Sequence, residues 1–493
     1  MAASTTAQAP SSAGLVLGIV GLLAFAVLSG IGVAVGEIDA MIIAVTMIAA
    51  VAALIDFRIG AVLMIVMLPL EGSTFFPGGM FGITGLNPMN LMLVTTLGSY
   101  LLRGRFRSFL PKPLVWMYIV PIVIAGLVGT QHVDRIYPYF YEVEVVHYLD
   151  AFGYLRDEMI KPLFMVLAAM LIAAAVERSQ NPDKFITPIV VAVWAMSLIA
   201  IGFVVASGVR LGALADPTQR AFFSAMGMHA NDLGRLYAVA YGLLLFTWWE
   251  TKDAALKTTL VATMAVAVIA MILTFSRGAF LGFMVINALF LLWKFNAKSV
   301  GIGLLVAGAA ALVMPAAIIR RVTMGFDTGD ANTVSAGRIE GIWGPLAPEF
   351  LKSPLWGNGL DSTMWADAMW AEQMLTVTHP HNAYLQALLD MGIIGLVLLV
   401  AYYIHVWRSM RSLGSNAWLS PTMRGFFQGG LASLACFFVS GLSGSSLRPV
   451  AEFSFLWLAI GVMYGVMARK PDRREETAAG ASPARRSVGR TPD

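Results

Sequence analysis

Residues 379–396 read His-Pro-His-Asn-Ala-Tyr-Leu-Gln-Ala-Leu-Leu-Asp-Met-Gly-Ile-Ile-Gly-Leu, and this stretch decides how the rest of the chain is interpreted. Asn382 is a favourable N-cap, so the sequence predicts a helix that begins there and continues as a long apolar run toward Trp407. His379 and His381 would then lie at the mouth of a membrane helix, next to the positive end of its dipole. A histidine in this position tends to stay neutral and is then able to accept a proton. A polar loop that only caps the helix explains the same residues equally well.

The composition indicates a membrane protein with many spans. Of the 493 residues, 58% are hydrophobic and only 13% are charged, whereas soluble proteins average about 25% charged residues. The mean hydropathy is +0.75. The net charge of +4 is small and unevenly placed, so no nucleic-acid partner is expected. Cys436 is the single cysteine, which excludes an intrachain disulfide as a support for the large loops.

Apolar stretches of roughly 20 residues are needed to cross a bilayer as helices. The sequence predicts an all-α polytopic membrane bundle of about 12–14 transmembrane helices, with a large, partly helical periplasmic loop over residues 319–382. A polar tail over 1–13 precedes the transmembrane domain (14–468), and a tail over 469–493 has a disordered composition. The Gly-rich residues between Pro69 and Pro88 predict a re-entrant or broken segment. The candidate spans are 14–35, 39–56, 59–70, 88–102, 114–129, 159–176, 185–206, 233–249, 257–275, 277–294, 299–318, 383–407, 424–443 and 451–468.

The distribution of basic residues predicts the orientation. If the N-terminus is cytoplasmic, every short inside connection is basic, and the inside segments hold 21 of the 33 Lys and Arg. Both termini are therefore expected in the cytoplasm. The twelve remaining basic residues, ten of them arginine, fall at the outer side: Arg135, Arg156, Lys161, Arg210, Arg220, Arg235, Arg277, Arg320, Arg321, Arg338, Lys352 and Arg448. The planar guanidinium group of arginine can bind phosphate through two parallel hydrogen bonds. For any one of these residues, contact with a lipid headgroup or a carboxylate is equally expected.

The outer segments also contain aromatic residues and two arginine motifs. Three outer connections, 130–158, 207–232 and 319–382, are long, and the first and the last are rich in aromatic rings, which suits either sugar binding or an interfacial belt. Arg277 would begin a helix at the membrane boundary, where an arginine is costly unless it faces a partner or a cavity. Arg338, Glu340 and Trp343 would share one face of a short helix, and a structural Arg–Glu pair is the alternative. Neither an Asp-x-Asp pair nor a His and Cys cluster predicts a metal site, so no cofactor is expected.

Three motifs follow one another along the chain: Ser276-Arg-Gly-Ala279, Arg338 with Trp343 and Pro354-Leu-Trp-Gly-Asn-Gly359, and His381-Asn382 leading to Gly392-Ile-Ile-Gly-Leu396. Taken in order, they resemble the motifs of the O-antigen ligase and polymerase superfamily of bacterial envelope proteins. The resemblance runs from about Asn231 to Leu396, and the membrane topology extends it over the chain. The chain departs from the family in its fourteen predicted spans, where about twelve are usual among ligases, and in Asp390, where glutamate is common.

The resemblance implies a glycosyltransferase of the inner membrane, similar in architecture to other lipid-linked-sugar (GT-C-like) transferases, whose active site faces the periplasm. Such enzymes move a glycan from an undecaprenyl diphosphate carrier to an acceptor hydroxyl, on lipid A–core in ligases and on a growing polysaccharide in polymerases. The reaction is expected to be inverting and metal-independent. The resemblance matches His381 to the catalytic histidine, and Arg277 and Arg338 to the arginines that bind diphosphate. Further candidates for substrate binding are His379, Asn382, Arg210, Arg220, Arg320 and Arg321.

The charges of the outer side fit this chemistry. The carrier diphosphate is the leaving group of this reaction, and two or more arginines can neutralise its negative charge without a metal. The acceptor hydroxyl has a high pKa, so a nearby base assists the reaction. A transporter or flippase of lipid-linked saccharide would also need outer arginines, but it predicts internal repeats, and none stands out. A purely structural assembly subunit is a third alternative. The sequence leaves ligase and polymerase open because nothing in it marks the acceptor.

Overall fold

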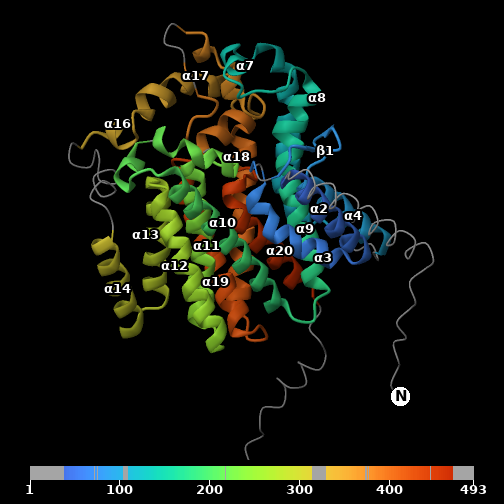
Figure 1. Cartoon of the computed structure of the whole chain (residues 1–493). Coiled ribbons are helices and arrows are strands. Elements are labelled where there is room, and N and C mark those ends of the chain that lie inside the picture. The colour runs from blue at the N-terminus through green and yellow to red at the C-terminus, as the bar shows by residue number, and fades with distance from the viewer. Residues whose placement is uncertain are drawn as a thin grey trace, which may run out of the picture.

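The computed structural model describes residues 38–71, 73–74, 76–103, 109–216, 218–313, 329–371, 375, 377–444 and 446–469. In this part of the chain nearly all regular structure is helical (Figure 1). The predicted all-α polytopic membrane bundle is therefore confirmed. The predicted span 14–35, the N-terminal tail and nearly all of the C-terminal tail lie outside the described residues.

The long helices follow the predicted apolar stretches, and their ends differ by a few residues. Among the described residues, six helical stretches are long and apolar enough to cross a membrane: Lys112–Arg135, Ala151–Glu177, Pro182–Ser207, Ala254–Leu273, Ala383–Gly414 and Ala451–Ala468. The total of 12–14 spans stays a prediction. The long helices are α2 (Ile38–Ile55), α3 (Phe57–Met67), α4 (Pro88–Arg103), α6 (Val120–Gly129), α9 (Lys161–Glu177), α10 (Ile186–Ser207), α11 (Ala230–Glu250), α12 (Ala254–Leu273), α13 (Arg277–Trp293), α14 (Ala297–Val313), α18 (Ala383–Gly414), α19 (Pro421–Gly441) and α20 (Ser454–Ala468).

The Gly-rich connection between α3 and α4 forms a small hairpin rather than a helical segment. Strands β1 (Gly79–Met80) and β2 (Ile83–Thr84) pair antiparallel. Gly82, at φ +74, supplies the left-handed turn between them, a conformation that glycine adopts without strain. Phe81, at φ +57, shares this turn, and the re-entrant or broken segment stays a prediction because it depends on where the membrane lies.

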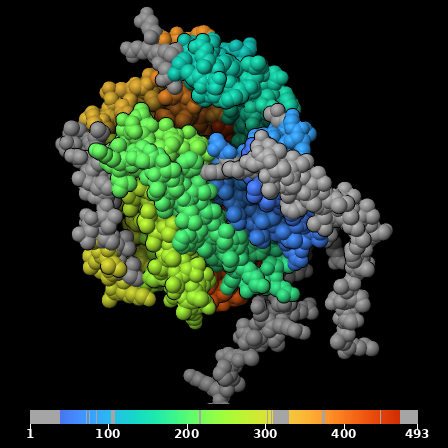
Figure 2. Space-filling view, viewed as in Figure 1, coloured from blue at the N-terminus to red at the C-terminus, as the bar shows by residue number. Residues whose placement is uncertain are grey.

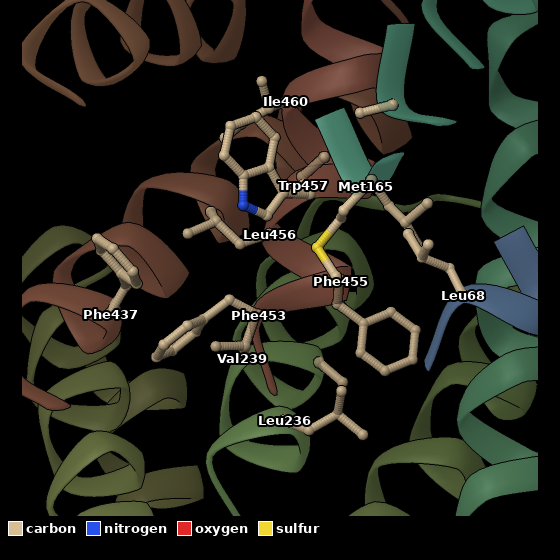
Figure 3. Packing of buried hydrophobic residues seen from close by; sticks show 14 of the residues in the cluster. Leu68, Met165, Leu236, Val239, Phe437, Phe453, Phe455, Leu456, Trp457 and Ile460 are labelled. Atoms are coloured by element: carbon tan, nitrogen blue, oxygen red, sulfur yellow. The ribbon is translucent and has the colours of Figure 1, made fainter. Parts of the chain in front are cut away.

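Helix α20 lies in the middle of the bundle and packs closely on α9, while α11 packs on α19. A Cβ atom added at Gly461 would lie 2.4 Å from the carbonyl oxygen of Ala169, and one at Gly429 would lie 2.7 Å from that of Gly242. Such small-residue contacts are typical of helix packing in membranes. Side chains from all four helices belong to one buried cluster, part of which Figure 3 shows: Phe455, Leu456, Trp457 and Ile460 of α20, Phe437 of α19, Leu236 and Val239 of α11, and Met165 of α9.

The helix connections gather at two opposite ends of the bundle. Helices α7 (Tyr139–Glu142), α8 (Ala151–Tyr154), α16 (Ala331–Val334) and α17 (Gly344–Lys352) all lie at the end predicted to be outside, at the top of Figure 1. At the other end, Arg178 lies 5.0 Å from the ring centroid of Phe57, and Ser420 Oγ donates to Asp183 Oδ1 at 2.8 Å. These contacts join residues of the same predicted side. Below, the two ends are called the outer end and the cytoplasmic end. The outer end is hollowed between the green α10–α11 connection and the teal α7–α8 segment (Figure 2).

Candidate active site at the outer end

The segment His379-Pro380-His381 enters α18 at the outer end. The side chain of Asn382 accepts hydrogen bonds from the backbone N–H groups of Tyr384 and Leu385, both at 3.1 Å, so the predicted N-cap is confirmed. The imidazole rings of His379 and His381 lie 4.2 Å apart between centroids. His381 has φ +51, in the left-handed region that residues other than glycine rarely adopt. Backbone strain of this kind persists only where the surrounding structure holds it, and it is concentrated at functional sites.

The Arg338–Trp343 segment contacts the histidine segment through Pro380. Trp343 Nε1 donates to the carbonyl oxygen of Pro380 at 2.8 Å, which ties the turn η8 (Ile339–Trp343) to the residue between the two histidines. Glu340 is exposed and accepts from Asn332 Nδ2 at 3.0 Å. Among the described residues Glu340 forms no ion pair with Arg338, so the structural Arg–Glu pair considered from the sequence is wrong. The half-buried Arg338 is available to the site.

Arg277 is placed by a tightly built turn before α13. Ser276 caps the helix by accepting from Ala279 N at 3.3 Å, and its hydroxyl donates to the carbonyl of Asn231 at 3.3 Å. Phe275 precedes it at φ +50, a second left-handed residue at the site. The buried Arg220 donates from Nη1 to the carbonyl of Thr274 at 2.6 Å. Arg220, a candidate for substrate binding, therefore holds the turn that presents Arg277.

Electrostatic effects relate Arg338 both to Arg277 and to His381. Burial lowers the pKa of Arg338, and the positive charges of Arg235 and Arg277 lower it further. Burial also lowers the pKa of His381 to about 3, with further contributions from His379, Arg338 and Arg235. Burial lowers the pKa of His379 as well. Both histidines are therefore neutral at physiological pH, as their place at the helix start predicts. At His381 the nearby arginines outweigh Asp232, whereas at His379 Asp361 and Asp232 oppose the lowering of the pKa.

Arg235 is a member of this cluster that no sequence motif marks. It is 4% exposed, and its Nε and Nη2 donate to Glu452 Oε2 at 2.9 and 2.7 Å, while Nη2 also bonds to Asp232. A Cβ atom added at Gly278 would lie 3.7 Å from Arg235 Nη1, which places this guanidinium beside the Arg277 turn. Asp232 could be recognised from its i, i+3 spacing, but Glu452 lies 217 residues away in the chain. Only the folded structure supplies that partner.

Helix α18 is not continuous, as the sequence predicted for 383–407, but is broken at Gly392. This residue has φ +65 and ψ −169, and a Cβ atom there would lie 2.4 Å from the backbone of Leu355. The break leaves carbonyl and N–H groups without partners inside the helix. The loop motif Pro354–Gly359 satisfies them: Asn358 N donates to Leu389 O at 2.8 Å and Gly359 N to Asp390 O at 3.0 Å, while Ile393 N donates to Pro354 O at 2.9 Å. Two motifs separated in the sequence thus form one structure.

Two buried carboxylates fasten the large loop to the bundle. Asp390 Oδ1 accepts from the backbone N of Ser362 at 3.1 Å, from its hydroxyl at 3.0 Å, and from Gln386 Nε2 at 2.8 Å. Arg448 Nη2 donates to both oxygens of Asp361 at 2.7 Å. Asp390, whose role the sequence did not reveal, therefore connects the broken helix to the loop that follows the motif.

The remaining candidates are placed less favourably. Arg210 is exposed at the start of η6 (Leu211–Ala215), and no hydrogen bond or ion pair connects it to the described residues around the histidines. Arg320 and Arg321 lie outside the described residues. In the part of the chain that the structure describes, no three His, Cys, Asp or Glu side chains are grouped so as to hold a metal ion.

The fold and the site together define a multi-pass membrane protein with arginines and neutral histidines gathered at one end of the bundle. Residues 262–400 match the family described as O-antigen ligase. This range includes Arg277, Arg338, both histidines and the break in α18. The resemblance to the O-antigen ligase and polymerase superfamily is confirmed by this match, which supports glycan transfer by a bacterial membrane enzyme. No curated protein matches the chain.

Proposed function

We propose that the protein transfers a glycan from an undecaprenyl diphosphate carrier to an acceptor hydroxyl at the periplasmic face of the inner membrane. The acceptor is lipid A–core if the enzyme is a ligase, or a growing polysaccharide if it is a closely related polymerase. The proposal rests on Arg338: its segment is bonded to Pro380 through Trp343, the charge of Arg277 lowers its pKa, and its own charge lowers the pKa of His381. The O-antigen ligase match over residues 262–400 supports the reaction class.

The arginines are suited to the diphosphate. Burial and neighbouring cations destabilise the charge of Arg338, as its lowered pKa indicates. An incoming dianion relieves this repulsion, so binding is favoured by an electrostatic field that exists before the substrate arrives. As the glycosidic bond to the diphosphate breaks, the negative charge that develops on the leaving oxygen is stabilised by the same guanidinium groups. In this proposal the arginines supply the positive charge that a metal supplies elsewhere.

His381 is proposed to act as the general base. The acceptor hydroxyl attacks the anomeric carbon from the side opposite the diphosphate, its proton passes to His381, and the anomeric configuration inverts. A histidine with a pKa of about 3 is a weak base in the free enzyme. The negative charge of the bound diphosphate raises that pKa, because an anion nearby stabilises the imidazolium. The base therefore gains strength only when the donor is in place.

A flippase remains the second candidate, since broken helices such as α18 also occur in transporters. In this protein, however, backbone groups of the Pro354–Gly359 loop satisfy the helix on both sides of the break. The break is therefore filled by protein rather than open to a transport path.

Reconstitution in vesicles separates these functions. The purified protein is supplied with a carrier-diphosphate glycan and with either lipid A–core or a second carrier-linked repeat. We expect a new glycosidic bond of inverted configuration with one of the two acceptors, and the acceptor that reacts distinguishes ligase from polymerase. Movement of the donor across the bilayer with no bond formed to either acceptor would instead establish a flippase.

A further inference from the structure

A polar cavity of about 230 Å³ lies at the outer end, and neither His379 nor His381 lines it. Its walls come from the turn η3 (Thr130–Arg135), from α17 and from the turn η9 (Ser362–Trp365), together with Asn358 and Leu389. None of its charged side chains belongs to the proposed diphosphate site. The cavity therefore requires an explanation of its own.

The cavity combines an aromatic wall with a wall of paired charges. The rings of His132 and Trp365 stack at 5.6 Å between centroids. Opposite charges bind one another: Lys352 Nζ lies 2.6 Å from Glu349 Oε2 and 2.7 Å from Asp367 Oδ2, and Arg135 lies 3.8 Å from Asp367. Asp367 does not itself line the cavity, but Asp367 and Glu349 compensate the two lining cations, Arg135 and Lys352, so the cavity attracts neither a phosphate nor a metal ion strongly. It offers both donors and acceptors of hydrogen bonds beside an aromatic face.

This chemistry matches an uncharged sugar ring. Sugar hydroxyls donate and accept hydrogen bonds, and the C–H face of the ring packs on aromatic side chains. Pockets for drug-sized ligands span roughly 300–1,000 Å³, so a cavity of about 230 Å³ suits a single ring.

The position of the cavity relates it to the histidines. Leu389 and Asn358 share a wall of the cavity and a backbone hydrogen bond of 2.8 Å, and Ser362 is bonded to Asp390. The cavity is thus built on the first half of α18, which begins directly after His381 and Asn382. From Ala383 to Leu389 this half rises about 9 Å. A sugar ring in the cavity would therefore belong to a part of the glycan that lies away from the reacting bond. The same helix half that supports the cavity also begins directly after the proposed catalytic histidine.

We propose that this cavity is a remote subsite that holds one uncharged sugar ring of a glycan substrate. The inference rests on the proposed function for the reaction, and it adds where the glycan is gripped. Binding at a distance from the bond sets the position of the chain and supplies energy that the reacting centre can use. The donor glycan and the acceptor glycan both offer such a ring, and kinetics can distinguish them.

The kinetic test uses His132→Trp, which fills the cavity from its half-buried wall, and Lys352→Met, which keeps the stem and removes the ammonium group. The matched control is Lys161→Met, because Lys161 is 52% exposed and bonded to Asp157 at 2.6 Å but does not line the cavity. We expect both cavity variants to raise the KM of one glycan substrate roughly tenfold, about 1.4 kcal/mol, with kcat at saturation close to that of the wild type. A rise for the donor assigns the ring to the donor, and a rise for the acceptor assigns it to the acceptor. Unchanged KM values for both substrates in an active, folded His132→Trp protein would overturn the subsite.

A binding test needs no turnover and so is independent of the proposed function. Saturation-transfer NMR on the purified protein would use neutral methyl glycosides of glucose, galactose, mannose and rhamnose as probes. We expect at least one to give a signal with the wild type and with Lys161→Met, and to lose it with His132→Trp and Lys352→Met. No signal from any probe with the wild type, or equal signals from all four proteins, would contradict the proposal. Absence of glycan transfer by a wild type that still binds a probe would count against the proposed function alone.

Discussion

Two kinds of arginine lie at the outer end, and their surroundings are opposite. Arg448 and Arg235 are 8% and 4% exposed, and each is bonded to a carboxylate from a distant part of the chain, Asp361 and Glu452. Arg338 is half-buried, is bonded to no carboxylate among the described residues, and lies near other cations that lower its pKa. The first kind joins segments of the fold. The second kind leaves a positive potential for an incoming anion.

This difference shows how one residue type serves two purposes in one protein. A buried arginine paired with a carboxylate has its charge compensated, and removing either partner leaves an uncompensated charge that costs several kcal/mol. A cation without such a partner costs stability in the resting protein but strengthens anion binding. Substitution of a paired arginine should therefore lower stability, whereas substitution of an arginine without a carboxylate partner should lower activity. The predictions below test that distinction, from the largest expected effect to the smallest.

The largest effect is expected at the histidine within the positive region. His381→Ala should lower the transfer rate by about 10²- to 10⁴-fold, the usual value of general-base assistance. The variant should keep its fold and its affinity for the carrier-linked donor, because the arginines remain. Single-turnover rates and donor binding by the purified protein measure both quantities. A variant that transfers at the wild-type rate but binds donor weakly would make His381 a binding residue only.

Substitution of the paired Arg448 should lower the stability of the folded protein. Arg448→Met removes the partner of the buried Asp361, and breaking a buried pair on one side costs about 3–5 kcal/mol. The midpoint of thermal unfolding in detergent should fall clearly. The double variant Arg448→Met with Asp361→Asn is the control, because it removes both charges and should recover part of the loss. If Arg448→Met unfolds at the wild-type temperature and loses donor binding instead, the assignment of the two kinds is reversed.

Replacing Arg338, which is proposed to bind the diphosphate, should lower turnover rather than stability. Arg338→Lys retains a positive charge but loses the planar fork that binds two phosphate oxygens. We expect a loss of roughly tenfold in kcat/KM, about 1.4 kcal/mol, with no change in the unfolding midpoint. A lysine variant with full activity would show that a point charge suffices at this position.

The pH dependence distinguishes the free enzyme from the enzyme with donor bound. Burial and nearby cations lower the pKa of His381 to about 3, so its basic form is present at every pH above that value in the free protein. The acid limb of kcat/KM should therefore fall near pH 3, well below the ordinary histidine range, while the acid limb of kcat should lie higher because bound diphosphate stabilises the imidazolium. Both limbs should vanish in His381→Ala. Coincident limbs near pH 6.5 would contradict this account of the site.

The smallest effect is expected from metal removal. If Arg277 and Arg338 supply the positive charge at the diphosphate, a chelator should leave turnover within the error of the assay. Activity that is lost in chelator and restored by magnesium or manganese would assign that role to a metal instead.

Local sequence rules predicted much of this protein. Apolar runs gave the described helices to within a few residues, and Asn382 was recognised as the N-cap of α18 because its preference depends only on the next three residues. The order of the motifs identified the superfamily. Gly392 could not be recognised as a break from its neighbours, since a glycine inside an apolar helical pattern is usually tolerated.

The tertiary structure decided which charges are compensated. Arg235, Arg338 and Arg448 all fall on the predicted outer side, and among them only Arg338 lies in a sequence motif. Their roles depend on partners such as Glu452, 217 residues beyond Arg235, and Asp361, 87 residues before Arg448. Similarly, Gly392 breaks α18 because the backbone of the Pro354–Gly359 loop is there to satisfy the exposed groups. Helix formation is governed by residues a few positions apart, whereas charge compensation and backbone satisfaction depend on groups that meet only when the chain has folded.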